Sequence, residues 1–183
     1  MTLEELIIAV VRVLGSLFVL RWALVGGLIA ILVDLSDLFL KNLLSLGGVR
    51  NYQAFDKILD QVYLGAFLAV ALWQWRGLAR SVAAGLYAFR LAGFVAYELS
   101  GGPRLVLFLF PNVFEFWFIY VAAMAHIRPG FRYTPRNAAI ALVPLTALKL
   151  FHEYALHVGK WLDGFTAVEA VEAIWDFFTA PFG

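Results

Sequence analysis

The chain contains no cysteine, and this absence excludes several kinds of chemistry. Without thiols the protein can form no disulfide, offer no thiolate nucleophile and hold no zinc ion or iron–sulfur centre through sulfur. Charge is also scarce, because only 15% of the 183 residues are charged and 14 basic residues are balanced by 13 acidic ones. Such a chain lacks the basic footprint of a nucleic-acid-binding protein. We therefore expect no nucleic-acid partner.

Apolar residues dominate the composition. They make up 63% of the chain, against roughly 45–50% in soluble domains, and give a mean hydropathy of +0.83. The composition predicts an all-α, polytopic membrane protein with one transmembrane domain over residues 1–183, because roughly 20 residues per crossing leave room for five or six spans. The opening residues, MTLEELIIAVVRVLG, contain two glutamates and no small-residue cleavage site. They predict a retained helix and not a signal peptide.

Apolar runs, breakers and polar loops together predict about six transmembrane helices. Gly26-Gly27 is the strongest breaker in the first long run, although a break closer to Arg21 is also compatible. Pro111-Asn112 predicts a kink in the fifth helix. The predicted spans are residues 4–25, 27–46, 55–75, 78–98, 104–127 and 137–158, with a short amphipathic helix over 165–179. Because that last helix has an acidic face, it could either pack on the protein or lie at the membrane interface.

The orientation of these helices is not set by the loops. For six spans, the loops on the two sides carry similar numbers of Lys and Arg, so the positive-inside rule gives no preference. We expect an integral membrane protein surrounded by lipid, in the cytoplasmic membrane of a prokaryote.

Four aspartates form two pairs in the second and third predicted spans. Asp34 and Asp37 are three residues apart, and Asp56 and Asp60 are four apart, so each pair projects from one face of a helix. A carboxylate in hydrocarbon costs several kcal/mol unless a cation, a partner or water compensates it. Two facing helices could bring all four carboxylates to one point, where hard oxygen ligands suit Mg²⁺, Mn²⁺ or Ca²⁺. The sequence thus predicts a metal site.

The segment VDLSDLFLKNLLSLGGVRNYQAFDKILDQVY, residues 33–63, resembles the signature of the CDP-alcohol phosphatidyltransferases. That family's pattern is D-x2-D-G-x2-A-R, eight residues, then G-x3-D-x3-D, across the end of one transmembrane helix and the start of the next. All four aspartates match. Other positions depart, since Leu38, Lys41, Asn42 and Tyr52 stand where the family has glycine, alanine, arginine and glycine. The first and third aspartates are also one residue further apart than in the pattern.

The resemblance implies a metal-dependent, dimeric enzyme of phospholipid synthesis. By the family's roles, Asp34, Asp37 and Asp56 would ligate one or two Mg²⁺ or Mn²⁺ ions. Asp60, at the same metal site, would be the catalytic general base. The metals would bridge a diphosphate while Asp60 takes the proton of an attacking alcohol. The reaction would transfer a phosphatidyl group from CDP-diacylglycerol, a nucleotide-linked lipid donor, to an alcohol and release CMP.

The same four aspartates are also compatible with two other functions. Asp60 could pair with Lys57 or Lys41, and the cluster would then be a structural ion network. That alternative describes a non-catalytic subunit or assembly partner of a larger membrane complex. A cation-binding transporter is the third possibility, although no paired broken helices mark two halves of the chain.

Arg90 lies near the middle of the fourth predicted span, where an unpaired charge is costly. It could form an ion pair with Glu115 or Glu98. It could instead bind the phosphate of a lipid cofactor or substrate, because its guanidinium matches phosphate oxygens in a bidentate way. Lys149 and Glu153 have i,i+4 spacing and are expected to pair with each other.

Overall fold

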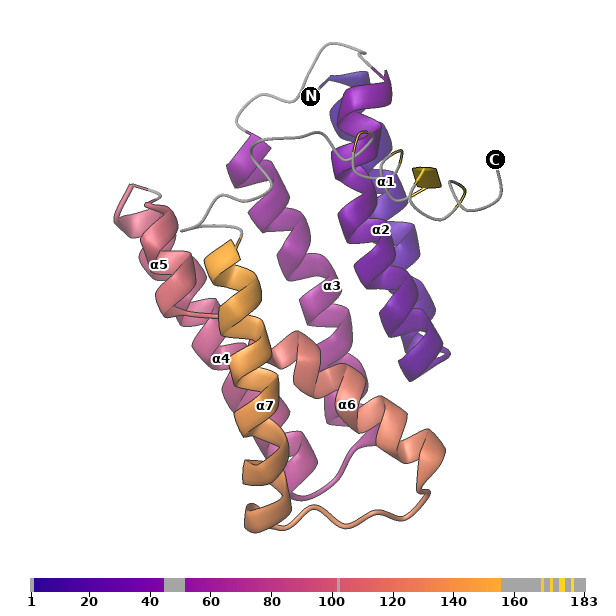
Figure 1. Ribbon diagram of the computed structural model, residues 1–183, viewed down its shortest axis with the longest axis vertical. Coiled ribbons are helices and arrows are strands. Elements are labelled where there is room, and N and C mark those ends of the chain that lie inside the picture. Colours follow the sequence, from indigo (N-terminus) through magenta and orange to yellow (C-terminus); the bar gives the residue numbers. More distant parts are fainter. Residues whose placement is uncertain are drawn as a thin grey trace.

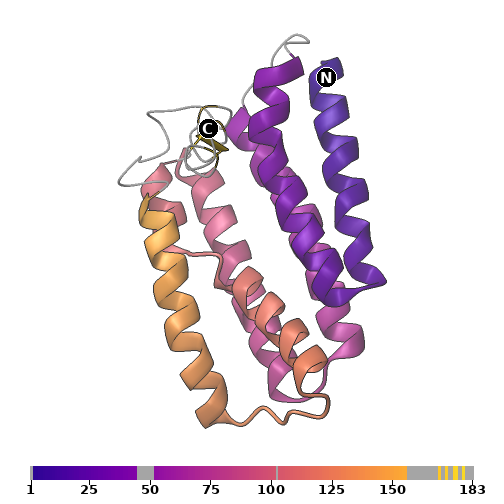
Figure 2. The ribbon, with the colours of Figure 1, turned by 45° about the vertical axis from the view of Figure 1, so that its right-hand side comes forward.

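The computed structural model describes residues 2–44, 52–101 and 103–155, together with residues 169, 172, 175, 176 and 179. These residues form a bundle of helices and contain no β-strand, which confirms the all-α prediction. Most helices run side by side along the long axis of the molecule (Figures 1 and 2). They are α1 (Leu3–Leu17), α2 (Ala23–Leu44), α3 (Tyr52–Gln74), α4 (Leu78–Leu99), α5 (Arg104–Leu109), α6 (Val113–Ile127) and α7 (Pro135–Glu153), with a 3-10 helix, η1 (Phe18–Leu20), directly after α1.

Side-chain caps define where α1 and α7 begin. The hydroxyl of Thr2 accepts a hydrogen bond from the backbone N–H of Glu5 at 3.1 Å, and the Glu5 carboxylate accepts one from the N–H of Thr2 at 2.8 Å. Thr134 and Asn137 form the same reciprocal cap, and Pro135 occupies the first position of α7. These bonds satisfy N–H groups that the first turn of a helix leaves without partners.

The first connection lies at Arg21 and Trp22, between η1 and α2. The break predicted at Gly26-Gly27 was therefore wrong in position, and the alternative near Arg21 was correct. Gly26 lies inside α2, where a Cβ atom would be 2.3 Å from the backbone carbonyl carbon of Phe18. This glycine is required because α2 passes very close to the backbone at the end of α1.

The fifth predicted span is interrupted. Phe110, Pro111 and Asn112 separate α5 from α6, so the structure has a full break where the sequence predicted a kink. A Cβ atom on Gly93 of α4 would lie 2.2 Å from the Cβ of Phe110. The interrupted segment therefore packs directly against α4.

Buried aromatic rings join α3, α4 and α6. The rings of Phe67 and Phe118 stack with their centroids 4.1 Å apart. Trp117 is fully buried, and its Nε1 donates a hydrogen bond to the carbonyl oxygen of Ala79 at 3.2 Å. This core fixes α3 in place, and α3 carries residues of both polar clusters described in the next section.

One described helix, α4, is long and apolar enough to cross a membrane, and 22% of its most apolar stretch is buried. Residues Ala23–Ser36 of α2 and the whole of α6 are apolar but shorter. The described residues thus show one candidate span, where the sequence predicted about six. The end of the sixth predicted span and most of the amphipathic helix predicted over 165–179 lie outside the described residues.

Candidate functional site

The candidate site lies where α1, α2 and α3 meet (Figure 1). Asp34 comes from α2, and Asp56 and Asp60 come from the first turns of α3. One carboxylate oxygen from each of these residues lies within 4.8 Å of the others. The structure thus brings together three of the four predicted aspartates. The side chain of the fourth, Asp37, lies outside the described residues, as does that of Lys41.

The guanidinium group of Arg12, on α1, lies among the three carboxylates. Its Nη1 donates to Oδ1 of Asp56 at 2.8 Å, and its Nη2 donates to Oδ1 of Asp60 at 2.9 Å. Nη2 also donates to Oδ1 of Asp34. The side chain of Arg12 is only 3% exposed. Sequence reasoning missed this residue, although a lone arginine inside an apolar span is itself a signal that buried acidic partners exist.

Close packing of α1 on α2 carries Arg12 to the carboxylates. Gly15 lies one turn after Arg12, and a Cβ atom there would be 2.8 Å from the methyl groups of Val33, the residue before Asp34. The hydroxyl of Ser16 donates to the carbonyl oxygen of Arg12 at 2.6 Å. Small residues at this contact therefore let α1 approach α2 beside Asp34.

Lys57 supplies a second cation to the cluster. Its Nζ donates to Oδ2 of Asp56 at 2.7 Å and to Oδ2 of Asp60 at 3.2 Å. Asp60, the predicted general base, thus accepts a hydrogen bond from Arg12 on one oxygen and from Lys57 on the other. The pairing of Asp60 with Lys57 that the sequence left open is the arrangement in the structure.

The three carboxylates have the right donor atoms for a divalent cation, but Arg12 stands in its place. Mg²⁺ holds oxygen ligands at about 2.0–2.1 Å, so opposite ligands lie about 4 Å apart. One oxygen from each of the three carboxylates lies within 4.8 Å of the others, which is near enough for them to share one ion. However, the guanidinium already donates to all three carboxylates that would hold the ion. A metal could bind here only after Arg12 had moved away.

A second buried polar cluster joins α3, α6 and α7. Oε2 of Glu115 accepts hydrogen bonds from Nδ2 of Asn112 at 3.0 Å and from the hydroxyl of Tyr63 at 3.4 Å. Nζ of Lys149 lies 3.7 Å from the same oxygen and 3.4 Å from Oε1 of Glu153. The predicted pairing of Lys149 with Glu153 is confirmed. Because Tyr63 lies on α3, the same helix carries parts of both clusters.

Arg90 lies beside the break between α5 and α6. Its Nη1 donates to the carbonyl oxygen of Phe110, the residue that ends α5, at 2.9 Å. Among the described residues it forms no ion pair with Glu115 or Glu98, the two partners that the sequence left open. Its Nε is buried and has no hydrogen-bond partner in the described part of the chain. Its binding of a lipid phosphate stays a prediction.

No family model matches this chain, and no curated protein or solved structure matches it either. The resemblance to the CDP-alcohol phosphatidyltransferases therefore rests on the motif aspartates alone.

Proposed function

We propose that this chain is a polytopic integral membrane protein whose aspartate cluster is an internal ion-pair network. In this proposal it works without catalysis, as a subunit or assembly partner of a larger membrane complex in a prokaryotic cytoplasmic membrane. The observation that carries the proposal is the position of Arg12. A cation supplied by the chain itself occupies the centre of Asp34, Asp56 and Asp60.

In both clusters carboxylates contact cations of the chain itself, and each cluster has one more carboxylate than cations. Arg12 and Lys57 stand against three aspartates on α2 and α3, and Lys149 stands against Glu115 and Glu153. Breaking a buried ion pair by removing one partner typically costs about 3–5 kcal/mol, because the other charge is left uncompensated. Such a network therefore holds α1 firmly against its neighbours.

The distribution of side chains on α1 supports insertion into lipid. The buried residues of this helix are Glu4, Glu5, Ile8, Arg12, Gly15 and Ser16, of which only Ile8 is a large apolar residue. Its exposed face carries the apolar residues Leu3, Leu6, Val10, Val11, Leu14 and Leu17. In water this arrangement would expose apolar surface and bury charge, whereas in a bilayer polar groups face the bundle interior. α4, in which only 22% of the most apolar stretch is buried, supports the same conclusion.

The decisive assay is CMP release from CDP-diacylglycerol. Purified protein in detergent is given Mg²⁺ or Mn²⁺ and a panel of acceptor alcohols, and circular dichroism verifies that it is folded. The proposal predicts no release by the wild-type protein. Metal-dependent release that is lost in Asp60→Asn but kept in Glu98→Gln, an exposed carboxylate on α4, would overturn it.

A second candidate function is metal-dependent transfer of a phosphatidyl group from a CDP-linked lipid to an alcohol. The observation that favours it is the convergence of Asp34, Asp56 and Asp60, which come from both halves of the motif. In this candidate Arg12 would move aside and Asp34, Asp56 and Asp60 would hold Mg²⁺ or Mn²⁺, which would stabilise charge on the diphosphate. Asp60 would accept the proton of the alcohol, the new bond would form between the alcohol oxygen and phosphorus, and CMP would leave. Formation of a homodimer belongs to the same candidate, because only the resemblance implies it.

The two candidates also differ in what Asp60→Asn does to the fold. In a structural network, the substitution leaves Arg12 and Lys57 with one fewer carboxylate and lowers the thermal unfolding midpoint. In an enzyme, it would abolish CMP release with little effect on that midpoint. A subunit should in addition co-purify with a partner at fixed stoichiometry from native membranes in mild detergent.

A further inference from the structure

Six arginines gather at one end of the bundle. They flank its three connections there, namely Arg21 before α2, Arg76 and Arg80 around the turn from α3 to α4, and Arg128, Arg132 and Arg136 between α6 and the start of α7. The connections from α3 to α4 and from α6 to α7 form the lower end of the molecule in Figures 1 and 2. The connection before α2 is also at the lower end of its helices, but it lies higher in both views. All six side chains are exposed, and none forms an ion pair with another described residue.

In the helices and connections that the structure describes, no acidic residue lies at this end. The stretches 6–33, 61–97 and 116–152 contain no Asp or Glu, and each includes one of the three connections. Glu4 and Glu5 begin α1, and Glu98 ends α4, so these acidic residues lie at the opposite end of their helices. Among the described residues, the charged side chains at this end of the bundle are therefore all basic.

Exposed tryptophans accompany the arginines. Trp22 is 52% exposed and Trp73 is 77% exposed, next to the first and second connections. The guanidinium carbon of Arg21 lies 5.5 Å from the centre of the Trp22 ring. Tryptophan is enriched at the level of lipid head groups, where one part of the ring is apolar and the other is wet. These two residues mark the membrane boundary at the arginine end.

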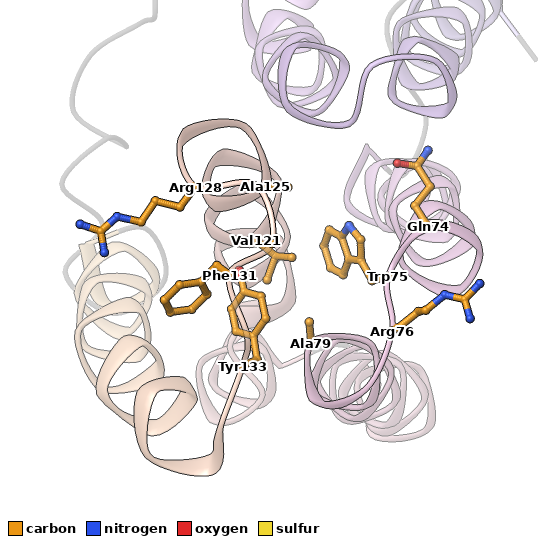
Figure 3. Close-up of a pocket in the computed structure, with 10 residues that line it drawn as sticks. Gln74, Trp75, Arg76, Ala79, Val121, Ala125, Arg128, Phe131 and Tyr133 are labelled. Carbon is orange, nitrogen blue, oxygen red and sulfur yellow. The ribbon is translucent and has the colours of Figure 1, made fainter.

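A hollow of about 250 Å³ opens at the same end, between α3, α6 and the loop that follows α6. Figure 3 shows the rings of Trp75, Phe131 and Tyr133 around it, with the side chains of Arg76 and Arg128 pointing away on opposite sides. The apolar rings thus lie inside the bundle end, and the guanidinium groups reach outward. This arrangement fits a surface that meets phosphate groups.

We propose that the six-arginine end faces the cytoplasm and lies against the anionic lipid head groups of the inner leaflet. Lys and Arg are concentrated on the cytoplasmic side of membrane proteins, and anionic lipids attract them. Arginine in particular binds phosphate oxygens through two parallel N–H groups. The inference rests on the proposal that the helices cross a membrane.

The structure also explains why the loops alone gave no orientation. Arg21 and Arg80 fall inside the predicted spans 4–25 and 78–98, so they were not counted as loop residues. In the structure Arg21 lies in the connection between η1 and α2, and Arg80 lies in the first turn of α4 beside Arg76. Placing the helix ends in space thus adds two arginines to the end that already has Arg76, Arg128, Arg132 and Arg136, whereas Arg104 begins α5 at the opposite end.

The absence of cysteine permits a clean test of the orientation. Ser81 and Ser100 lie at the two ends of α4, both exposed, and each hydroxyl donates to a backbone carbonyl four residues earlier. The variants Ser81→Cys and Ser100→Cys are treated with a membrane-impermeant maleimide in intact and in permeabilised cells. Pro129→Cys, in the exposed loop after α6, provides a second labelling site at the arginine end. We expect this site to lie further from the membrane boundary than Ser81.

We expect Ser100→Cys to react in intact cells, and Ser81→Cys and Pro129→Cys to react only after permeabilisation. The reverse pattern would overturn the orientation while leaving the membrane-spanning proposal intact. Reaction of all three variants from the same side, or recovery of the protein in the soluble fraction, would instead overturn the membrane-spanning proposal itself.

The head-group contact is tested separately in nanodiscs. We expect the wild-type protein to unfold at a higher temperature in phosphatidylglycerol than in phosphatidylcholine, because the arginines bind the anionic lipid. High salt and the triple substitution of Arg128, Arg132 and Arg136 by Gln should both reduce that difference, whereas the matched triple substitution by Lys should keep most of it. Equal unfolding temperatures of the wild-type protein in the two lipids would contradict the contact.

Discussion

Arg12 has the role in this cluster that a bound cation would otherwise have. Its guanidinium group donates to carboxylates from two helices, and its own helix is thereby tied to both. The planar fork of arginine suits this role, because it directs several N–H groups at once. Lysine at the same position would keep the charge and lose the fork.

Replacing Arg12 by glutamine should lower the free energy of unfolding by about 3–5 kcal/mol, because three carboxylates lose their shared cation. Arg12→Lys, the matched control, should cost clearly less. Chemical denaturation in detergent measures both values. Equal stability of Arg12→Gln and the wild-type protein would show that the ion pairs contribute nothing to the fold.

Tyr133 gives the protein a predictable response to alkaline pH. Burial, together with the neighbouring Tyr120, raises the pKa of Tyr133 to about 12 from the usual 10. Because the folded state favours the protonated phenol, stability is unaffected below pH 10 and decreases as the pH rises from about 10 through about 12. Thermal unfolding across this range should show a smaller decrease for Tyr133→Phe. An identical decrease in both proteins would contradict the assignment.

The sequence predicts the aspartates of the cluster but not the arginine that binds them. The convergence of Asp34, Asp56 and Asp60 could be predicted, because i,i+4 spacing on α3 and position on consecutive helices depend only on local geometry. The partner of these residues could not be predicted. Arg12 reaches them only because Gly15 lets α1 approach Val33 on α2, and that contact depends on tertiary packing.

Among the helices, the break between α5 and α6 is stabilised by charges at both helix ends. Arg90 donates to the carbonyl oxygen of Phe110 at the C-terminal end of α5, and Glu115 lies in the first turn of α6. A cation at a helix C-terminus and an anion at an N-terminus each interact favourably with the helix dipole. The two buried charges that the sequence suggested as a pair thus compensate separate helix ends.

Gly93→Ala should destabilise the protein, because the new methyl group would lie 2.2 Å from the Cβ of Phe110. We expect a cost of about 1–3 kcal/mol, typical of an overpacked contact. Gly85→Ala on the same helix is the matched control, since nothing lies within 4 Å of its Cβ position. It should be neutral or stabilise α4 by up to about 1 kcal/mol through helix propensity. Chemical denaturation compares the two, and equal costs would contradict close packing at the break.

Helix existence was easier to predict than helix boundaries. Long apolar runs identified each helical region, but the same residue type, glycine, can end a helix or allow two helices to touch. Gly26 was expected to end a helix and instead lies within α2 against Phe18. Pro111 was expected to bend a helix and instead lies between two, because Gly93 and Arg90 accommodate the interruption.

The molecule as a whole separates its charges along the direction of its helices. Exposed arginines occupy one end, and Asp56 and Asp60 lie in the first turns of α3, toward the other. If the arginine end is cytoplasmic, the carboxylate cluster lies in the outer half of the membrane, away from the compartment that contains cytidine nucleotides. In that orientation, a structural network would be favoured over a nucleotide-dependent transferase.

The most direct test of the central claim measures the thermal unfolding midpoint of the wild-type protein and of Arg12→Gln in detergent, each with and without Mg²⁺. If Arg12 is the cation of the cluster, Mg²⁺ should leave the midpoint of the wild-type protein unchanged. Arg12→Gln should unfold at a lower temperature, and Mg²⁺ should raise that temperature by binding the freed carboxylates. A saturable rise in the midpoint of the wild-type protein with Mg²⁺ would contradict the account and identify the cluster as a metal site.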